Sequence, residues 1–125
     1  MKKTLIILLS IVVFTGLNAQ NIEFEKQNFP DQKKEMKEAV NNIEMGDYYI
    51  NQEYPKYKLA RRAYQRAQDF NPSNALLNYK LGVTVIKDFD KVNALGYFKK
   101  AHDLNPNVHP KIRFQLGKAY QLNYD

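Results

Sequence analysis

The segment DFNP at residues 69–72 returns as DLNP at residues 103–106. The same displacement along the chain relates two sets of small and aromatic residues that precede these segments. The sets are Ala60, Tyr64 and Ala67, and Ala94, Phe98 and Ala101. An internal repeat with a period of about 34 residues is typical of an array of helix-turn-helix units. The sequence therefore predicts an all-helical, repetitive chain.

Each set of alanines and an aromatic residue has the spacing of one helix face. Intervals of four and three residues bring the three side chains together, and two alanines allow another helix to approach closely. Gly46, Gly82 and Gly117 also stand inside stretches that are otherwise helical. Glycine there costs about 1 kcal/mol relative to alanine. We therefore expect each glycine to lie at a tight contact between helices.

Asn-Pro pairs at residues 71–72 and 105–106 separate the units. A residue before proline is biased away from helical geometry, so each pair ends one unit and turns the chain into the next. Helices are expected at residues 31–50, 55–70, 74–87, 91–104 and from 110 onward. The turn at residues 51–55 is expected to be two residues longer than its counterpart in the next unit. The reason is the spacing between the helical glycine and the first alanine of the set. This spacing is two residues longer in the first unit than in the second.

This pattern resembles the tetratricopeptide repeat, a helix-turn-helix unit of about 34 residues. The second unit carries small and large residues at the places expected for that family: Leu81, Gly82, Ala94, Phe98, Ala101 and Pro106. The family's early tryptophan is absent, because the chain contains no tryptophan. The resemblance implies an all-α superhelix with two complete repeats and a partial third, at about residues 31–72, 73–106 and 107–125.

In this family the first helix of each hairpin lines a concave surface that binds other proteins. Counting from the three glycines gives the candidate partner-binding residues Ile43, Asp47, Asn51, Tyr79, Val83, Lys87, Phe114, Lys118 and Leu122. The row of Ile43, Tyr79 and Phe114 suits an apolar or helical segment better than an acidic carboxylate tail. The alternative is that this row only packs between repeats.

The amino terminus has the features of a secretory signal peptide. Lys2 and Lys3 precede an apolar run at residues 5–14, which is shorter than the roughly 20 residues that span a bilayer. Cleavage is expected after Ala19, leaving an extended lead at residues 20–30 and a helical domain at 31–125. The chain contains no cysteine, so neither a disulfide nor a lipid-bearing cysteine is expected. We expect a periplasmic protein associated with the outer membrane.

Residues 28–49, 76–82 and 114–125 resemble the repeat region that opens cell-envelope proteins of the Bacteroidota. In those proteins, tetratricopeptide repeats precede a β-propeller and an OmpA-like peptidoglycan-binding domain, and some belong to the type IX secretion and gliding machinery. The resemblance implies an exported scaffold that links an outer-membrane complex to the cell wall. Envelope proteins are the expected partners, and any contact with peptidoglycan would need a domain beyond residue 125.

The sequence offers no recognisable catalytic constellation. His102 and His109 are the only histidines and there is no cysteine to complete a metal cluster. Ser10 and Ser73 lack a patterned base, and the isolated glycines form no phosphate-binding loop. We expect no enzymatic activity, no cofactor, no bound metal and no small-molecule substrate.

The densest basic cluster, at residues 56–66, is expected to be a solvated outer face. It comprises Lys56, Lys58, Arg61, Arg62 and Arg66. The formal net charge of +6 falls to +4 without the signal segment, which holds two lysines and no acid. Nucleic-acid binding therefore ranks below protein binding.

Two alternatives for the function of the chain stay open: an accessory repeat domain of a cell-wall hydrolase, and a self-assembling module that stacks its repeat ends.

Overall fold

The computed structural model describes residues 20–124, which are all-helical, with no strand in that range. The elements are η1 (Lys26–Asn28), α1 (Lys33–Ile50), α2 (Tyr57–Phe70), α3 (Ala75–Lys87), α4 (Lys91–Leu104) and α5 (Ile112–Tyr124). Each α-helix begins within two residues of its expected start, so the all-α prediction is confirmed. The expected signal segment at residues 1–19 lies outside the described residues.

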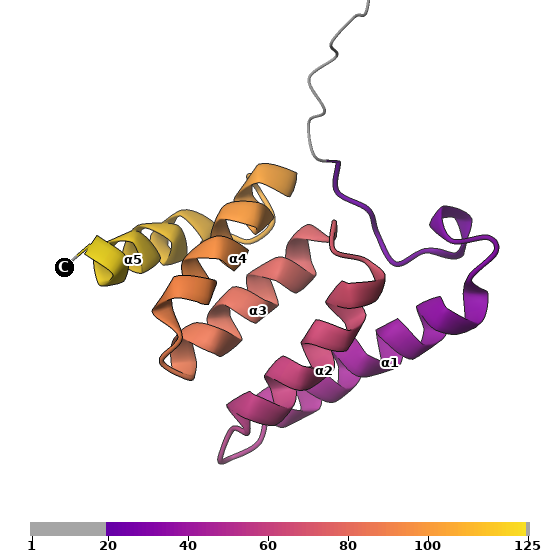
Figure 1. Cartoon of the computed structure of the whole chain (residues 1–125), viewed down its shortest axis with the longest axis horizontal. Helices are drawn as coiled ribbons and strands as arrows, with labels where there is room; N and C mark the ends of the chain where they lie inside the picture. Colours follow the sequence, from indigo (N-terminus) through magenta and orange to yellow (C-terminus); the bar gives the residue numbers. More distant parts are fainter. Residues whose placement is uncertain (1–19, 125) are drawn as a thin grey trace, which may run out of the picture.

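The helices form a row of hairpins, seen in sequence order from indigo to yellow in Figure 1. α1 packs on α2, and α3 packs on α4. The second hairpin joins the first through α2 and α3, and α5 packs mainly on α4. Each element therefore contacts chiefly its neighbours in sequence, which is the contact pattern of a repeat array.

The turns inside the two hairpins differ in length, as expected. The first spans residues 51–56 and the second spans residues 88–90, so the difference is three residues instead of two. A backbone hydrogen bond closes the longer turn, in which the N–H of Lys56 donates to the carbonyl of Tyr49 at 3.0 Å.

The turns between units use their Asn-Pro pairs in the same way. The Oδ1 atom of Asn71 accepts from the N–H of Ser73 at 3.3 Å, and Oδ1 of Asn105 accepts from the N–H of Asn107 at 3.0 Å. An asparagine side chain that bonds the backbone two residues ahead stabilises a turn. The repeat in the sequence is thus also a repeat of local hydrogen bonding.

The alanine and aromatic sets form the buried faces of α2 and α4. Their members, Ala60, Tyr64, Ala67, Ala94, Phe98 and Ala101, are all buried. Two hydrophobic clusters, one centred on each hairpin, lie wholly within residues 24–119. The described part of the chain therefore contains its own core.

Two of the three glycines lie at the tight contacts that were expected. A Cβ atom added at Gly82 would lie 2.5 Å from Cε1 of Phe98, and one at Gly46 would meet the Tyr64 ring as closely. No side chain fits in either place without displacing the ring. The expectation of a tight contact is wrong for Gly117, because a Cβ atom there would meet nothing within 4 Å. No described residue covers that side of α5.

The lead at residues 20–29 is fastened to the turn between α2 and α3. The N–H of Ile22 donates to the carbonyl of Ser73 at 2.9 Å. The Nδ2 atoms of Asn71 and Asn74 both donate to the carbonyl of Ile22, each at 2.9 Å. The lead was expected to be extended, and it also contains the short helix η1.

Candidate functional site

The nine candidate residues lie on α1, α3 and α5 or directly after α1, but the structure gathers only some of them. Asp47, Asn51, Tyr79 and Val83 line one groove of about 190 Å³ between α1 and α3. Lys87, Phe114, Lys118 and Leu122 are exposed and line none of the principal hollows, while Ile43 lines a separate one. The central part of the candidate surface is therefore the groove between the first two units.

Asp47 is the polar centre of this groove. Its carboxylate accepts hydrogen bonds from Nζ of Lys80 at 2.8 and 2.9 Å and from the hydroxyl of Tyr64 at 2.6 Å. These contacts join α1, α2 and α3. Burial, and after it the hydrogen bond to Asp47, raises the pKa of the Tyr64 hydroxyl far above its ordinary value. The hydroxyl therefore stays protonated and continues to donate.

Lys80 is a groove residue that the sequence analysis missed. It lies two residues before Gly82, outside the positions counted from the glycine anchors, and it lines the hollows on both sides of the Asp47 contact. An acid directly after the first glycine and a base before the second could have suggested the pair. The distance between them depends on how the two hairpins pack, and the sequence does not show that.

Tyr79 is a packing residue, which corrects the expectation that it stands free on the concave face. Its side chain is only 7% exposed. The ring packs on Phe98 with centroids 5.9 Å apart and stacks on the His109 imidazole at 4.4 Å. Burial also raises the pKa of the Tyr79 hydroxyl. For this residue the packing alternative is the correct one, because α4 and the turn that follows it close over the ring.

Phe114, the counterpart of Tyr79 on α5, is 68% exposed. Lys118 and Leu122 on the same helix are exposed as well. α5 therefore offers the free aromatic surface that was expected of the whole row.

Ile43 lies beside the chain's own lead. It lines a hollow of about 110 Å³ with Phe24 of the lead and with Leu76, Leu77 and Lys80 of α3. Phe24 is partly buried and packs against the hydrophobic cluster of the first hairpin. An extended segment with an aromatic side chain is thus accommodated where α1 and α3 meet.

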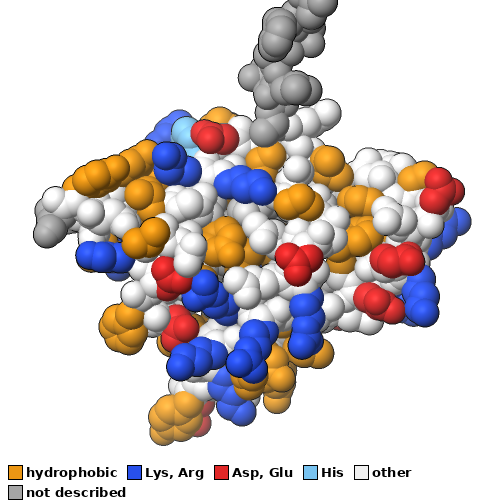
Figure 2. Space-filling model, viewed as in Figure 1, with side chains coloured by type: hydrophobic (Ala, Val, Ile, Leu, Met, Phe, Trp, Pro, Cys, Tyr) orange, Lys and Arg blue, Asp and Glu red, His pale blue; other side chains and the backbone are white. Residues whose placement is uncertain are grey.

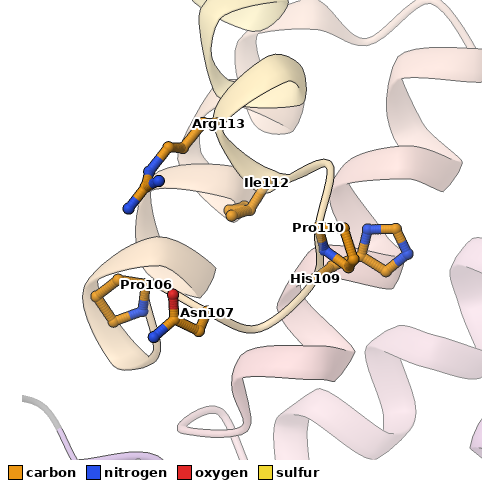
Figure 3. Close-up of a pocket in the computed structure, with 6 residues that line it drawn as sticks. All are labelled: Pro106, Asn107, His109, Pro110, Ile112 and Arg113. Atoms are coloured by element: carbon orange, nitrogen blue, oxygen red, sulfur yellow. The ribbon is translucent and has the colours of Figure 1, made fainter.

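A third hollow, of about 320 Å³, lies at the turn between α4 and α5 (Figure 3). Its lining residues are Pro106, Asn107, His109, Pro110, Ile112 and Arg113. The Nδ1 atom of His109 accepts from the N–H of Lys111 at 3.1 Å, and its ring stacks on Tyr79. His109 therefore caps the backbone N–H of Lys111 and packs on the ring of Tyr79. Apart from His109, the lining offers one cation, Arg113, and no carboxylate, hydroxyl or thiol group.

Side chains that could bind a metal ion do not gather in the described part of the molecule. Within residues 20–124, no three His, Asp or Glu side chains lie in an arrangement that could hold a metal ion. The described helices include none with the length and apolar character needed to cross a membrane.

A scan against protein-family models gave no match, and searches of curated proteins and of solved structures gave none either. The functional argument therefore rests on the geometry of the groove and of the surfaces around it.

Proposed function

We propose that the chain is a tetratricopeptide-like scaffold that binds a segment of another protein along the face formed by α1, α3 and α5. The observation that carries this proposal is the docking of the chain's own lead. Phe24 packs against the cluster of the first hairpin and lines a hollow together with Ile43, and the side chains of Asn71 and Asn74 hold the backbone carbonyl of Ile22. The chain's own lead is thus held through its backbone at the turn between α2 and α3 and through an aromatic side chain beside Ile43 of α1.

The neighbouring groove has the mixed lining that suits such a segment. Ile50, Tyr79 and Val83 supply apolar surface, while Asn51, Thr84 and the Asp47–Lys80 pair supply polar atoms. Grooves that bind peptides combine apolar contacts for side chains with polar groups for the backbone. The salt bridge is partly exposed, so it can exchange hydrogen bonds with an incoming segment.

The wider role that we propose is that of an exported envelope scaffold, in keeping with the apolar amino-terminal run and with the resemblance to envelope proteins. Its partner is another envelope protein. Attachment to the cell wall would be the task of a domain beyond residue 125. No catalytic role is proposed for the described residues.

Photo-cross-linking in the exporting cell tests the groove. A cross-linking amino acid at Asn51, which is exposed at the groove, should give a discrete product with a partner, whereas one at the exposed Lys99 of α4 should not. Val83→Arg should reduce the Asn51 product at least about tenfold, because a charged side chain of this length fills the groove. Phe114→Ala should weaken it as well if the ligand reaches α5, since exposed aromatic residues often dominate an interface.

The matched control is Gly96→Arg, an arginine introduced at an exposed position of α4 outside the groove, where an added Cβ atom would meet nothing within 4 Å. It should leave the Asn51 product unchanged. Circular dichroism should give the same helical content for all variants. Loss of the product in Gly96→Arg together with its retention in a folded Val83→Arg would reject the groove as the binding site.

A further inference from the structure

The tips of the two hairpins carry exposed aromatic side chains. Tyr54 is 79% exposed in the first turn, and Phe89 is 95% exposed in the second. Val92, 68% exposed, follows on α4. In Figure 2, hydrophobic side chains protrude at the lower margin of the molecule, where the two turns lie in Figure 1. We refer to residues 53–62 and 87–92 as the tip edge.

The two halves of the tip edge lie side by side. Arg61 of α2 forms an ion pair with Asp90 at 3.0 Å, and Asp88 helps to line a hollow formed mainly by residues 55–59. Both turns follow the carboxyl ends of α1 and α3, whereas the lead is fastened at the amino end of α3. The tip edge is therefore separate from the site where the lead docks.

Phe89 is held in a backbone conformation that is unfavourable for it. Its φ of 63° makes it the one non-glycine residue with positive φ among the described residues. The N–H of Asp90 donates to the carbonyl of Val85 at 2.9 Å, so Phe89 occupies the helix-ending position that glycine usually takes. The exposed ring gains little from packing within the chain. Strain of this kind at an exposed residue points to a role in binding.

Cations surround these aromatic residues. The basic residues of the tip edge are Lys56, Lys58, Arg61, Arg62, Lys87 and Lys91, and its acids are Glu53, Asp88 and Asp90. Asp90 is paired with Arg61, and hydrogen bonding from Asn93 lowers the pKa of its carboxyl group. Six cations against three acids leave the edge positively charged. Figure 2 shows Lys and Arg side chains gathered between the protruding hydrophobic ones.

We propose that the tip edge binds the surface of an anionic lipid bilayer, with Tyr54 and Phe89 entering the headgroup region and the cations facing lipid phosphates. Aromatic rings are favoured at the boundary between headgroups and acyl chains. Each Lys or Arg near an anionic membrane strengthens binding by a factor of about five. An inorganic polyanion such as polyphosphate would use the cations alone. The two protruding rings are what favour a lipid surface.

Co-sedimentation with vesicles tests this proposal. The protein would begin at Gln20, because the described residues contain both hydrophobic clusters and because the apolar run at residues 5–14 would itself bind lipid. Vesicles of equal parts phosphatidylglycerol and phosphatidylcholine should bind the protein, and vesicles of phosphatidylcholine alone should not. Raised salt should weaken the binding.

Two pairs of variants separate the contributions. Phe89→Asn should reduce vesicle binding about fivefold or more, whereas Phe114→Asn, the same change at an exposed ring on α5, should not. Replacing Lys56 and Lys58 by Gln should reduce binding roughly twentyfold, whereas replacing Lys33 and Lys34 by Gln should leave it unchanged. Asparagine tolerates positive φ, so Phe89→Asn should melt no lower than the parent chain.

Two results would overturn the proposal. Equal binding to both kinds of vesicle, or binding to neither, would exclude recognition of an anionic bilayer. If Phe89→Asn binds as well as the parent chain while the double lysine variant does not, the edge is a simple polyanion site that also takes nucleic acid or polyphosphate.

Discussion

α3 and α5 carry the same Leu-Gly motif, but the two copies lie in different surroundings. Leu81 and Gly82 of α3 correspond to Leu116 and Gly117 of α5. Phe98 presses on Gly82, whereas nothing lies within 4 Å of a Cβ atom added at Gly117. The motif was the same, but only α3 has packed neighbours on both sides.

The aromatic residues three positions before these glycines differ in the same way. Tyr79 is buried between Phe98 and His109, while Phe114 is largely exposed. A repeat position therefore fixes the direction of a side chain on its helix, and the next unit decides whether that side chain becomes core or surface.

The largest effect is expected from charging the contact between α3 and α4. Ala101 is fully buried, so Ala101→Arg should lower the free energy of unfolding by about 3 kcal/mol or more, through overpacking and the burial of a charge. Urea denaturation followed by circular dichroism measures this change. Lys99→Ala, at an exposed position of the same helix, should stay within about 0.5 kcal/mol of the parent chain.

Ala119→Arg extends that prediction to α5. Ala119 is also fully buried, but its helix packs mainly on α4 and can separate locally. Its substitution should therefore cost less than Ala101→Arg. Equal losses in the two variants would mean that α5 is held as firmly as the hairpins.

A moderate effect is expected at the covered glycine. Gly82→Ala should lower the free energy of unfolding by about 1–3 kcal/mol, because the added methyl group meets the buried Phe98 ring. For a domain of this size, each kcal/mol corresponds to a drop in melting temperature of about 4–8 °C. A gain in melting temperature would show that the ring can move aside and that the contact is looser than its geometry indicates.

The smallest effect, of opposite sign, is expected at the open glycine. Gly117→Ala should raise the free energy of unfolding by up to about 1 kcal/mol, because alanine favours the helix and meets no neighbour. The thermal melts of Gly82→Ala and Gly117→Ala should therefore move in opposite directions. A loss of stability in Gly117→Ala would mean that something packs on α5 in solution, such as a second copy of the chain.

The order and approximate bounds of the helices could be predicted from the sequence because they depend on local chemistry. The Asn-Pro pairs end helices through backbone sterics and side-chain hydrogen bonds, and the intervals of three and four residues define a helix face. The buried alanines and the roles of Gly46 and Gly82 followed from these intervals. The residues of the groove could be predicted only in part from the sequence. The burial of Tyr79 and the Asp47–Lys80 pair depend on how neighbouring helical hairpins pack.

By itself, the sequence determined that this chain is helical, where its helices end and which face of each helix is packed, since those properties depend on residues close together along the chain. Only the tertiary structure decided which motif positions became surface. It covered Gly82, left Gly117 open and buried Tyr79. It also tied Asp47 to Lys80 across two hairpins and placed Asp88 and Asp90 of the second turn beside residues 55–61. These outcomes depend on how whole helices stack, and contacts between distant residues leave no periodic signal in the sequence.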